Sequence, residues 1–325
     1  MPAASVVIPV FNGERFIGEA IQSVLGQTLR DLEIIVVDDG STDSTETAVR
    51  RFPAPVAYYR QENSGAGVAR NLGVSVARAE WIAFLDADDL WHPQKLAMQM
   101  EHVKRRPEAG FFYSDMDAVD EHGNIIAQGL LSRELERRKK GNRSNLIAIA
   151  FGDRPFPRPS TVLLRREIFL RAGGFNPIFR KSNHEDFDLF ARIARICVMH
   201  FIRQSLAKYR VHATQGTQDI ARSDENWLLL LHCLWQTYRN EPEKQTKLLR
   251  YYARYFCNQG RDFMIARNYH EARRCFSLAF HYQPLYKKNL GRWLLSYLPT
   301  FRELYTARKR EPRLQRYKEI FPQYP

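Results

Sequence analysis

Four short apolar runs, separated by helical patterns, occupy the N-terminal third of this chain. They are rich in Val, Ile, Tyr and Phe, a composition typical of β-strands, and they cover residues 5–10, 33–37, 56–59 and 81–85. When single helices separate successive strands, the strands form βαβ units and lie parallel in one sheet. The sequence therefore predicts an α/β fold with a mostly parallel sheet flanked by helices.

Each predicted strand ends in a polar turn. The turns follow Val10, Val37, Tyr59 and Leu85. Parallel sheets bind ligands beyond the carboxyl ends of their strands, so we expect these turns to share one edge and one crevice. Four charged side chains that follow three of these strands are predicted to meet there: Asp39, Arg70, Asp86 and Asp88.

The densest group of charges lies in the turn 86–89, where three carboxylates occupy four positions. Carboxylates this close repel one another, and a hard divalent cation that bridges them to a substrate phosphate is a common remedy. A plain helix N-terminus, which also favours acidic residues, is the alternative. The turn 9–13 lacks the glycines of a dinucleotide-binding loop, and the chain has no P-loop motif. Phosphate charge would therefore have to be met by a metal ion and by side chains.

The charge and cysteine content exclude several classes of protein. The formal net charge of +13 is uneven, because residues 1–100 carry 8 Lys/Arg against 13 Asp/Glu and residues 220–325 carry 20 against 9. No nucleic-acid-binding module accompanies the basic tail, so we expect no nucleic-acid partner. The four cysteines lie far apart, which argues against a zinc site or a disulfide framework. We find no secretory signal and no apolar run of roughly 18 residues. We therefore expect a cytoplasmic protein that can attach peripherally to the inner face of the cell membrane.

A second acidic stretch begins a predicted amphipathic helix at residue 185. Glu185 and Asp186 fall in its first turn, where they either complement the helix dipole or act in a site. Further on, a predicted strand ends at Arg210 and is followed by His212, and this spacing lets the two side chains share a site. The charged run 132–144 is expected to be a solvated loop.

Six short motifs, taken in order, resemble those of the family-2 glycosyltransferases. They are VIPVFN at 7–12, DDGSTD at 38–43, ENSG at 62–65 with ARN at 69–71, FLDADD at 84–89, GGF at 173–175 and ED at 185–186. The resemblance extends from Ser5 to His212. It implies the GT-A fold, which is a Rossmann-like and mostly parallel sheet flanked by helices, and an inverting enzyme that uses a nucleotide-diphosphate sugar.

The resemblance also implies a donor-binding set. Asp39 would accept the N3–H of uracil, which favours a UDP-sugar donor. Asp88 would ligate a Mg²⁺ or Mn²⁺ ion on the diphosphate, and His212 would complete the shell of ligands. The donor-binding residues implied in this way are Pro9, Phe11, Asp39, Arg70, Asp86, Ala87 and Asp88.

On the acceptor side, the resemblance implies that Asp186 is the general base. It would take the proton of the acceptor hydroxyl as that oxygen attacks the anomeric carbon, and one such displacement inverts the configuration. Helix N-terminal N–H groups are expected to hold the pKa of Asp186 low. Glu185, Gly173 and Gly174 would contact the acceptor, which would be a glycan or a lipid-linked oligosaccharide.

Residues 1–219 are expected to form the catalytic domain, and residues 220–325 an all-α C-terminal extension. The spacing of apolar residues over 256–284 fits one tetratricopeptide-like helical hairpin or a generic helical cap. An apolar and aromatic stripe with flanking Lys and Arg covers 287–310. Such a stripe is typical of an interfacial helix on an anionic membrane, or of plain core.

Two other functions stay open from the sequence. A catalytically idle protein would bind sugar nucleotides and use its helical tail for interactions, although the joint presence of Asp39, Asp88 and Asp186 argues against this reading. A nucleotidyltransferase is a poorer fit, because the first turn lacks the glycine-rich and basic loop that such enzymes use on triphosphates.

Overall fold

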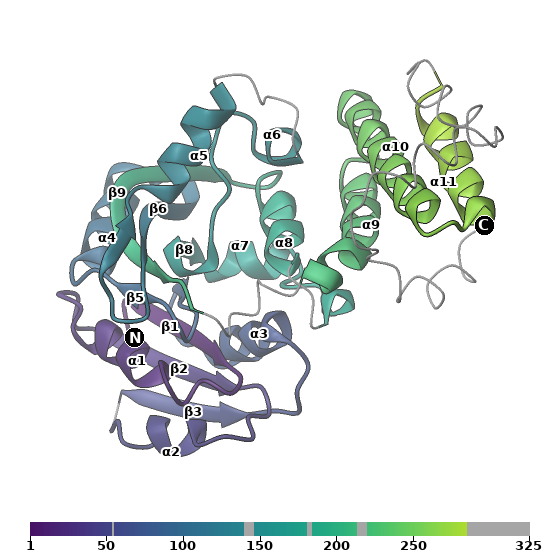
Figure 1. The fold of residues 1–325 in the computed structure, drawn as a ribbon. Helices are drawn as coiled ribbons and strands as arrows, with labels where there is room; N and C mark the ends of the chain where they lie inside the picture. Colours follow the sequence, from purple (N-terminus) through teal and green to yellow (C-terminus); the bar gives the residue numbers. More distant parts are fainter. Residues whose placement is uncertain (54, 140–145, 181–183, 213–219, 285–325) are drawn as a thin grey trace. The chain divides into compact units, whose positions relative to one another are not determined.

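The structure is a computed structural model that describes residues 1–284 except 54, 140–145, 181–183 and 213–219. The chain divides into two compact units, Met1–Asn226 and Trp227–Pro325. Figure 1 shows the first unit in purple to green and the second in green to yellow.

One sheet organises the first unit. In the part of this unit that the structure describes, nine strands form the sheet, in the order β3-β2-β1-β4-β8-β6-β9-β5 with β7 paired to β6. The strands are β1 (Ala4–Val10), β2 (Leu32–Asp38), β3 (Val56–Arg60), β4 (Trp81–Phe84), β5 (Leu90–Trp91), β6 (Ala109–Val119), β7 (Ile125–Ala127), β8 (Val162–Arg165) and β9 (Val198–Arg210). The expected α/β fold with a mostly parallel sheet flanked by helices is confirmed.

The first four strands are parallel, so their carboxyl ends lie at one edge. In this register Val10 pairs with Asp38 and Val7 with Phe84. β8 runs antiparallel between β4 and β6, whereas the long β9 lies parallel beside β6, as Figure 1 shows. The short β5 then pairs with the end of β9, with Leu90 opposite Lys208. This last pairing brings the end of β9 to the acidic turn that precedes β5.

The helices of the first unit connect and cover these strands. They are α1 (Ile17–Leu25), α2 (Thr45–Val49), α3 (Ala66–Val76), α4 (Lys95–Arg105), α5 (Leu130–Lys139), α6 (Leu146–Phe151), α7 (Arg166–Arg171) and α8 (Glu185–Ile193). α3 packs on β1 and β2. The contact is close at Gly73, where an added Cβ would lie 2.3 Å from Cγ1 of Val7. Only a residue without a side chain lets α3 approach the sheet this closely.

The expectation of a solvated loop at 132–144 is wrong over α5 (Leu130–Lys139). The N–H groups of Leu131 and Ser132, in the first turn of this helix, donate to the buried carboxylate of Asp115 at 2.8 and 3.1 Å. Leu131 and Leu135, one turn apart, are buried. A cap from a distant strand and one apolar stripe therefore hold this charged segment as a helix.

The second unit is helical where the structure describes it. Its helices are α9 (Ile220–Thr237), which begins in the first unit, α10 (Pro242–Ile265) and α11 (Tyr269–Tyr282). α10 and α11 form a tight hairpin, because a Cβ added to Gly260 would lie 2.6 Å from the ring of Phe276. The helical C-terminal extension is thus confirmed, while the basic stripe at 287–310 lies outside the described residues. Across the described part of the chain, no helix has the length and apolarity needed to cross a membrane.

Candidate active site

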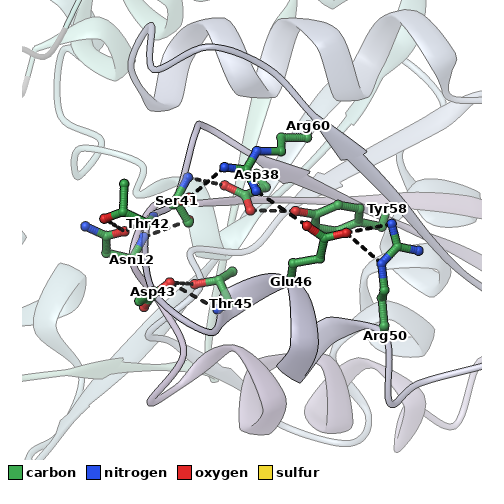
Figure 2. A network of polar contacts seen from close by, with 10 residues as sticks. All are labelled: Asn12, Asp38, Ser41, Thr42, Asp43, Thr45, Glu46, Arg50, Tyr58 and Arg60. Carbon is green, nitrogen blue, oxygen red and sulfur yellow. Dashed lines mark hydrogen bonds and ion pairs between the residues drawn. The ribbon is translucent and has the colours of Figure 1, made fainter.

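The turns after β1 and β2 interlock and form one platform (Figure 2). Asn12 has a positive φ of 50°. Its N–H donates to Oγ of Ser41 at 2.9 Å, and its Oδ1 accepts the N–H of Thr42 at 2.8 Å. The Gly13 N–H donates to Oγ1 of Thr45 at 2.9 Å. Phe11 precedes Asn12 in this turn and is 51% exposed, so the platform has a solvent-exposed aromatic residue at its edge.

The two adjacent acids after β2 have different partners. Asp38 accepts the N–H of Ser41 at 2.7 Å and the hydroxyl of Tyr58 at 2.6 Å, as Figure 2 shows. Burial and this bond raise the pKa of Tyr58 to about 12. Asp39 instead accepts from the turn after β3, namely from Nε2 of Gln61 at 2.7 Å and from two backbone N–H groups. Asp38 therefore supports the platform, whereas Asp39 ties two strand-end turns together.

Arg70 on α3 is the centre of the charged cluster. Its side chain is 5% exposed, and Nη2 donates to Asp86 at 2.6 Å while Nη1 donates to Glu185 at 3.3 Å. Burial alone would lower the pKa of Arg70, but Asp86 and Glu185 raise it, so the guanidinium stays charged. Its Nε has no partner among the described residues. The acidic turn and the start of α8 thus meet through one buried cation.

Of the three carboxylates in the acidic turn 86–89, one is buried and two are partly exposed. Asp89 is 2% exposed and accepts from the Ser160 hydroxyl at 2.6 Å and from the Arg210 N–H at 3.1 Å. Asp88 keeps a side chain that is 34% exposed, with Oδ2 3.0 Å from Nε2 of His212. Burial and the nearby Asp86 raise the pKa of Asp88. Asp86 and Asp88 are therefore the two carboxylates of this turn with exposed surface.

Arg210, the last residue of β9, holds the acidic turn 86–89 in place through hydrogen bonds. Arg210 is 1% exposed and donates from Nε to the Asp88 carbonyl at 3.0 Å, and from Nη2 to Glu19 at 2.7 Å. The ring of His212 lies 4.8 Å from that of Phe16. As the spacing of Arg210 and His212 suggested, both reach the same residue, Asp88. Within the described residues, however, no group of three or more His, Cys, Asp or Glu side chains forms a complete metal site.

Glu185 and Asp186 share the first turn of α8. Burial and the neighbouring Asp186 raise the pKa of Glu185 to about 7. Burial also raises the pKa of Asp186, although Arg158 and Arg70 act to lower it. The low pKa expected for Asp186 is therefore wrong in direction. The helix terminus gives its side chain one short backbone bond, from the N–H of Phe187 at 2.7 Å, and desolvation outweighs that bond.

The two glycines before α8 shape a loop that packs on α3. Gly173 and Gly174 have φ values of 82° and 65°. A Cβ on Gly174 would lie 2.8 Å from Oδ1 of Asn71. Asn71 also bonds both backbone groups of Phe175, whose ring centroid lies 5.2 Å from the guanidinium of Arg70. These glycines therefore place Phe175 against Arg70, and a contact with an acceptor stays a prediction.

The remaining two predicted donor residues lie beside the platform. Pro9 is buried in β1, opposite Val37. Ala87 lies near the first turn, since a Cβ on Gly13 would be 3.8 Å from that of Ala87. The structure thus brings the acidic turn next to the platform, and it joins Asp86 to Glu185 through Arg70.

Sequence reasoning missed three polar side chains at this site. Ser160 bridges the acidic turn, Gln61 bonds Asp39, and Arg158 acts electrostatically on Asp186. A usable signal existed for Gln61, because it stands in the turn after β3, at the edge already expected to bind a ligand. Arg158 is flanked by two prolines, a sign of a rigidly held cation, but nothing in the sequence places it near α8.

These residues lie on a fold that has known relatives. The family model described as glycosyl transferase family 2 matches residues 5–173, and the chain belongs to this family. An uncharacterized glycosyltransferase of Rickettsia felis is 30% identical over 243 residues, which are 74% of this chain and 38% of that protein. One of Nostoc sp. is 30% identical over 226 residues, 67% of either chain. The chain thus spans well under half of the Rickettsia felis relative.

A solved structure has a similar fold. The crystal structure of S. aureus TarS 1–349 in complex with UDP-GlcNAc matches with a TM-score of 0.65 and 19% identity, over 94% of this chain and 92% of that one. At this identity the match shows the fold alone, and it confirms the GT-A fold that the motifs implied.

Proposed function

We propose that this chain is an inverting, metal-dependent glycosyltransferase. It would move a sugar from a nucleotide-diphosphate donor, a UDP-sugar, to a hydroxyl of a glycan or lipid-linked acceptor. The observation that carries the proposal is the Arg70 bridge, 2.6 Å to Asp86 and 3.3 Å to Glu185. It connects the acidic turn expected to hold the donor with the helix start expected to hold the base. The UDP-GlcNAc bound to the TarS structure supports the choice of donor.

On the donor side, the platform and Asp39 would bind the nucleoside. Phe11, with 51% of its surface exposed, offers a ring face against which the base can stack. Arg70 and Asp86 would then hold the phosphates and sugar hydroxyls, since a guanidinium suits oxyanions and a carboxylate accepts from hydroxyls.

The ligand set at the acidic turn fits a divalent ion that the substrate completes. Mg²⁺ is usually bound by one or two carboxylates together with substrate phosphates and waters, so a site need not contain three protein ligands. Asp88 and His212, whose Oδ2 and Nε2 lie 3.0 Å apart, would hold Mg²⁺ or Mn²⁺. Such an ion, when bound, supplies positive charge that stabilises the leaving diphosphate.

On the acceptor side, Asp186 would accept the proton of the attacking hydroxyl. Burial raises its pKa toward the range in which a general base is effective, while Arg158 and Arg70 favour its ionised form. Glu185, Gly173 and Gly174 would contact the acceptor. A single displacement with one base inverts the anomeric configuration.

We assign this chemistry to residues 1–219 and treat residues 220–325 as a helical extension. The positive charge of that extension, 20 Lys/Arg against 9 Asp/Glu, supports peripheral attachment to an anionic membrane surface. A cytoplasmic enzyme working at the inner face of the membrane would account for both parts.

UDP release from a panel of UDP-sugars, with Mn²⁺ or with EDTA, tests the proposal. Asp186→Asn should lower turnover by about 100-fold or more while UDP affinity is kept, because loss of a general base slows the chemistry and not binding. Asp153→Asn removes an exposed carboxylate as the matched control. If UDP binds but wild type and Asp186→Asn show the same background turnover, the idle sugar-nucleotide-binding protein is the correct reading. Turnover that EDTA leaves unchanged would contradict the metal assignment.

A further inference from the structure

We propose that Gln61 is a nucleobase-specificity residue, which donates a hydrogen bond to a uracil carbonyl beside the N3–H that Asp39 accepts. This inference rests on the proposed UDP-sugar donor and deepens it. Neither the motifs nor the family relation assigns a role to Gln61.

The orientation of the Gln61 side chain follows from its partner. Its amide lies 2.7 Å from Oδ1 of Asp39. An ionised carboxylate can only accept hydrogen bonds, so the amide must present its NH₂ group to Asp39 and not its oxygen. One N–H is used in this bond. Within the described part of the chain the second N–H has no partner, and it remains available beside the same carboxylate.

Asp39 has one acceptor position left for a ligand. Its Oδ1 accepts from Gln61 and from the Ser64 N–H at 2.8 Å, and its Oδ2 accepts the Gly65 N–H at 2.7 Å. A carboxylate offers about four lone-pair positions, so these three bonds leave one on Oδ2. The pair Asp39 and Gln61 thus presents one acceptor and one donor next to each other.

The backbone holds this pair rigidly. The Gln61 N–H donates to the Asp38 carbonyl at 2.9 Å, which fixes the turn after β3 on the turn after β2. Gly40, with a φ of 80°, makes the close approach possible, because a Cβ there would lie 3.0 Å from the Asn63 nitrogen. Asp39 is 3% exposed, and Gln61 is half-buried. Little reorganisation would be needed when a base binds.

This donor–acceptor pair matches uracil and rejects cytosine. Uracil has an N3–H donor flanked by carbonyl acceptors at positions 2 and 4. Cytosine has a lone pair at N3 and an amino donor at position 4. Its N3 would face the Asp39 carboxylate, which is a repulsive contact in either orientation of the base. Where Gln61 bonds the carbonyl at position 4, the cytosine amino group would also face the Gln61 N–H, and this second contact is repulsive too. Contacts of this kind produce discrimination because a buried polar group is left without a partner.

The test measures binding of UDP, CDP, 2-thio-UDP and 4-thio-UDP to the full chain by calorimetry. It compares wild type with Gln61→Met, which keeps the volume and removes the amide. Gln22→Met, at an exposed position of α1, is the matched control. Because sulfur is a weak acceptor, the thio-analogue that replaces the carbonyl bonded by Gln61 should bind wild type more weakly than UDP does.

We expect Gln61→Met to weaken UDP binding about fivefold, the worth of one neutral hydrogen bond. We also expect it to bind UDP and the affected thio-analogue equally. If the variant binds UDP as wild type does, or loses the same factor on UDP and on both thio-analogues, Gln61 does not contact the base and the inference is wrong. If wild type binds no UDP at all, the proposed donor itself fails, and this outcome is distinct from the first two.

Discussion

At the scale of single residues, burial governs the protonation of Glu185 more than its ion pair does. Its side chain is 13% exposed beside Arg70, yet burial and Asp186 raise its pKa from 4.5 to about 7. Between these two pH values the folded chain holds a proton that the unfolded chain has released. The stability that this proton brings is therefore complete below about pH 4.5 and is lost as the pH rises through about 7.

Glu185→Gln, which cannot ionise, is expected to remove this pH dependence. A shift of this size corresponds to roughly 3 kcal/mol. The free energy of unfolding of wild type relative to the variant should therefore fall by up to that amount between about pH 4.5 and pH 8. Urea unfolding at several pH values measures it, and Glu80→Gln, at a side chain that is 66% exposed, is the control. Parallel pH profiles for wild type and Glu185→Gln would contradict the raised pKa.

Lys95 is a buried basic residue, and in contrast to Glu185 its pKa is lowered by burial. It is 0% exposed, with Nζ 2.8 Å from Oε1 of Gln99 and 3.9 Å from the ring centroid of Trp91. Burial lowers its pKa well below 10.5. The unfolded chain keeps the proton at neutral pH while burial favours its release on folding, so stability rises with pH until the unfolded lysine also loses its proton.

Lys95→Met is expected to stabilise the protein at neutral pH. The gain should be about 1 kcal/mol after the loss of the bond to Gln99, and it should shrink as the pH approaches about 10. Denaturant unfolding at both pH values tests this, with the exposed Lys104→Met on the same helix as the control. A destabilised Lys95→Met variant at neutral pH would show that the ammonium form is held by Trp91 and Gln99 instead.

At the scale of elements, the contact of α3 with β1 depends on Gly73. An alanine Cβ there would lie 2.3 Å from Cγ1 and 3.1 Å from Cγ2 of Val7, inside the core under the site. Gly73→Ala should cost about 1–3 kcal/mol through overpacking, despite the better helix propensity of Ala. Gly18→Ala in α1 is the matched control, since its Cβ would meet Phe52 at an ordinary 3.9 Å. Equal melting temperatures of the two variants would disprove the tight contact.

Elements with a complete local pattern could be predicted from the sequence. The strands β1 to β4 and helix α1 combine the right period with a turn or a glycine at their ends, so neighbouring residues suffice to identify them. α5 could not be predicted in this way. Its first turn is capped by Asp115, which lies 16 residues before Leu131 in the sequence and inside another element. A charge run alone does not reveal such a partner.

The candidate site likewise has features that the sequence could predict and features that it could not. The rule for strand ends placed Asp88 at the ligand-binding edge, whereas a shared metal site for Asp88 and His212, 124 residues apart, was implied only by the family resemblance. The bond from Arg70 to Glu185 spans 115 residues and depends on how α8 packs against α3, which no periodicity encodes. The raised pKa of Asp186 was missed for the same reason, because desolvation depends on tertiary packing.

At the scale of the whole molecule, the charge is divided between the two ends of the chain. Residues 1–100 carry 13 Asp/Glu against 8 Lys/Arg, whereas residues 220–325 carry 20 Lys/Arg against 9 Asp/Glu. Residues 1–100 are acidic, which suits a metal ion, but residues 1–219 together carry 29 Lys/Arg against 27 Asp/Glu and so contribute little net attraction to, or repulsion from, anionic lipid. A basic tail would be attracted to the same lipid with about 1 kcal/mol per Lys or Arg near the surface. The sequence therefore predicts that the tail determines any membrane attachment.

Co-sedimentation with vesicles tests this prediction on the full chain. At low salt the protein should sediment with anionic vesicles and not with neutral ones, and added salt should release it because screening weakens surface electrostatics. Replacing Lys287 and Lys288 with Glu should reduce the bound fraction, since each reversal both removes an attractive charge and adds a repulsive one. Replacing the exposed Arg105, the last residue of α4, and the adjacent Arg106 with Glu makes an equal change of charge in the first unit and should have little effect. Equal recovery on anionic and neutral vesicles would contradict electrostatic attachment, and an equal loss from both double variants would show that net charge, and not the tail, sets binding.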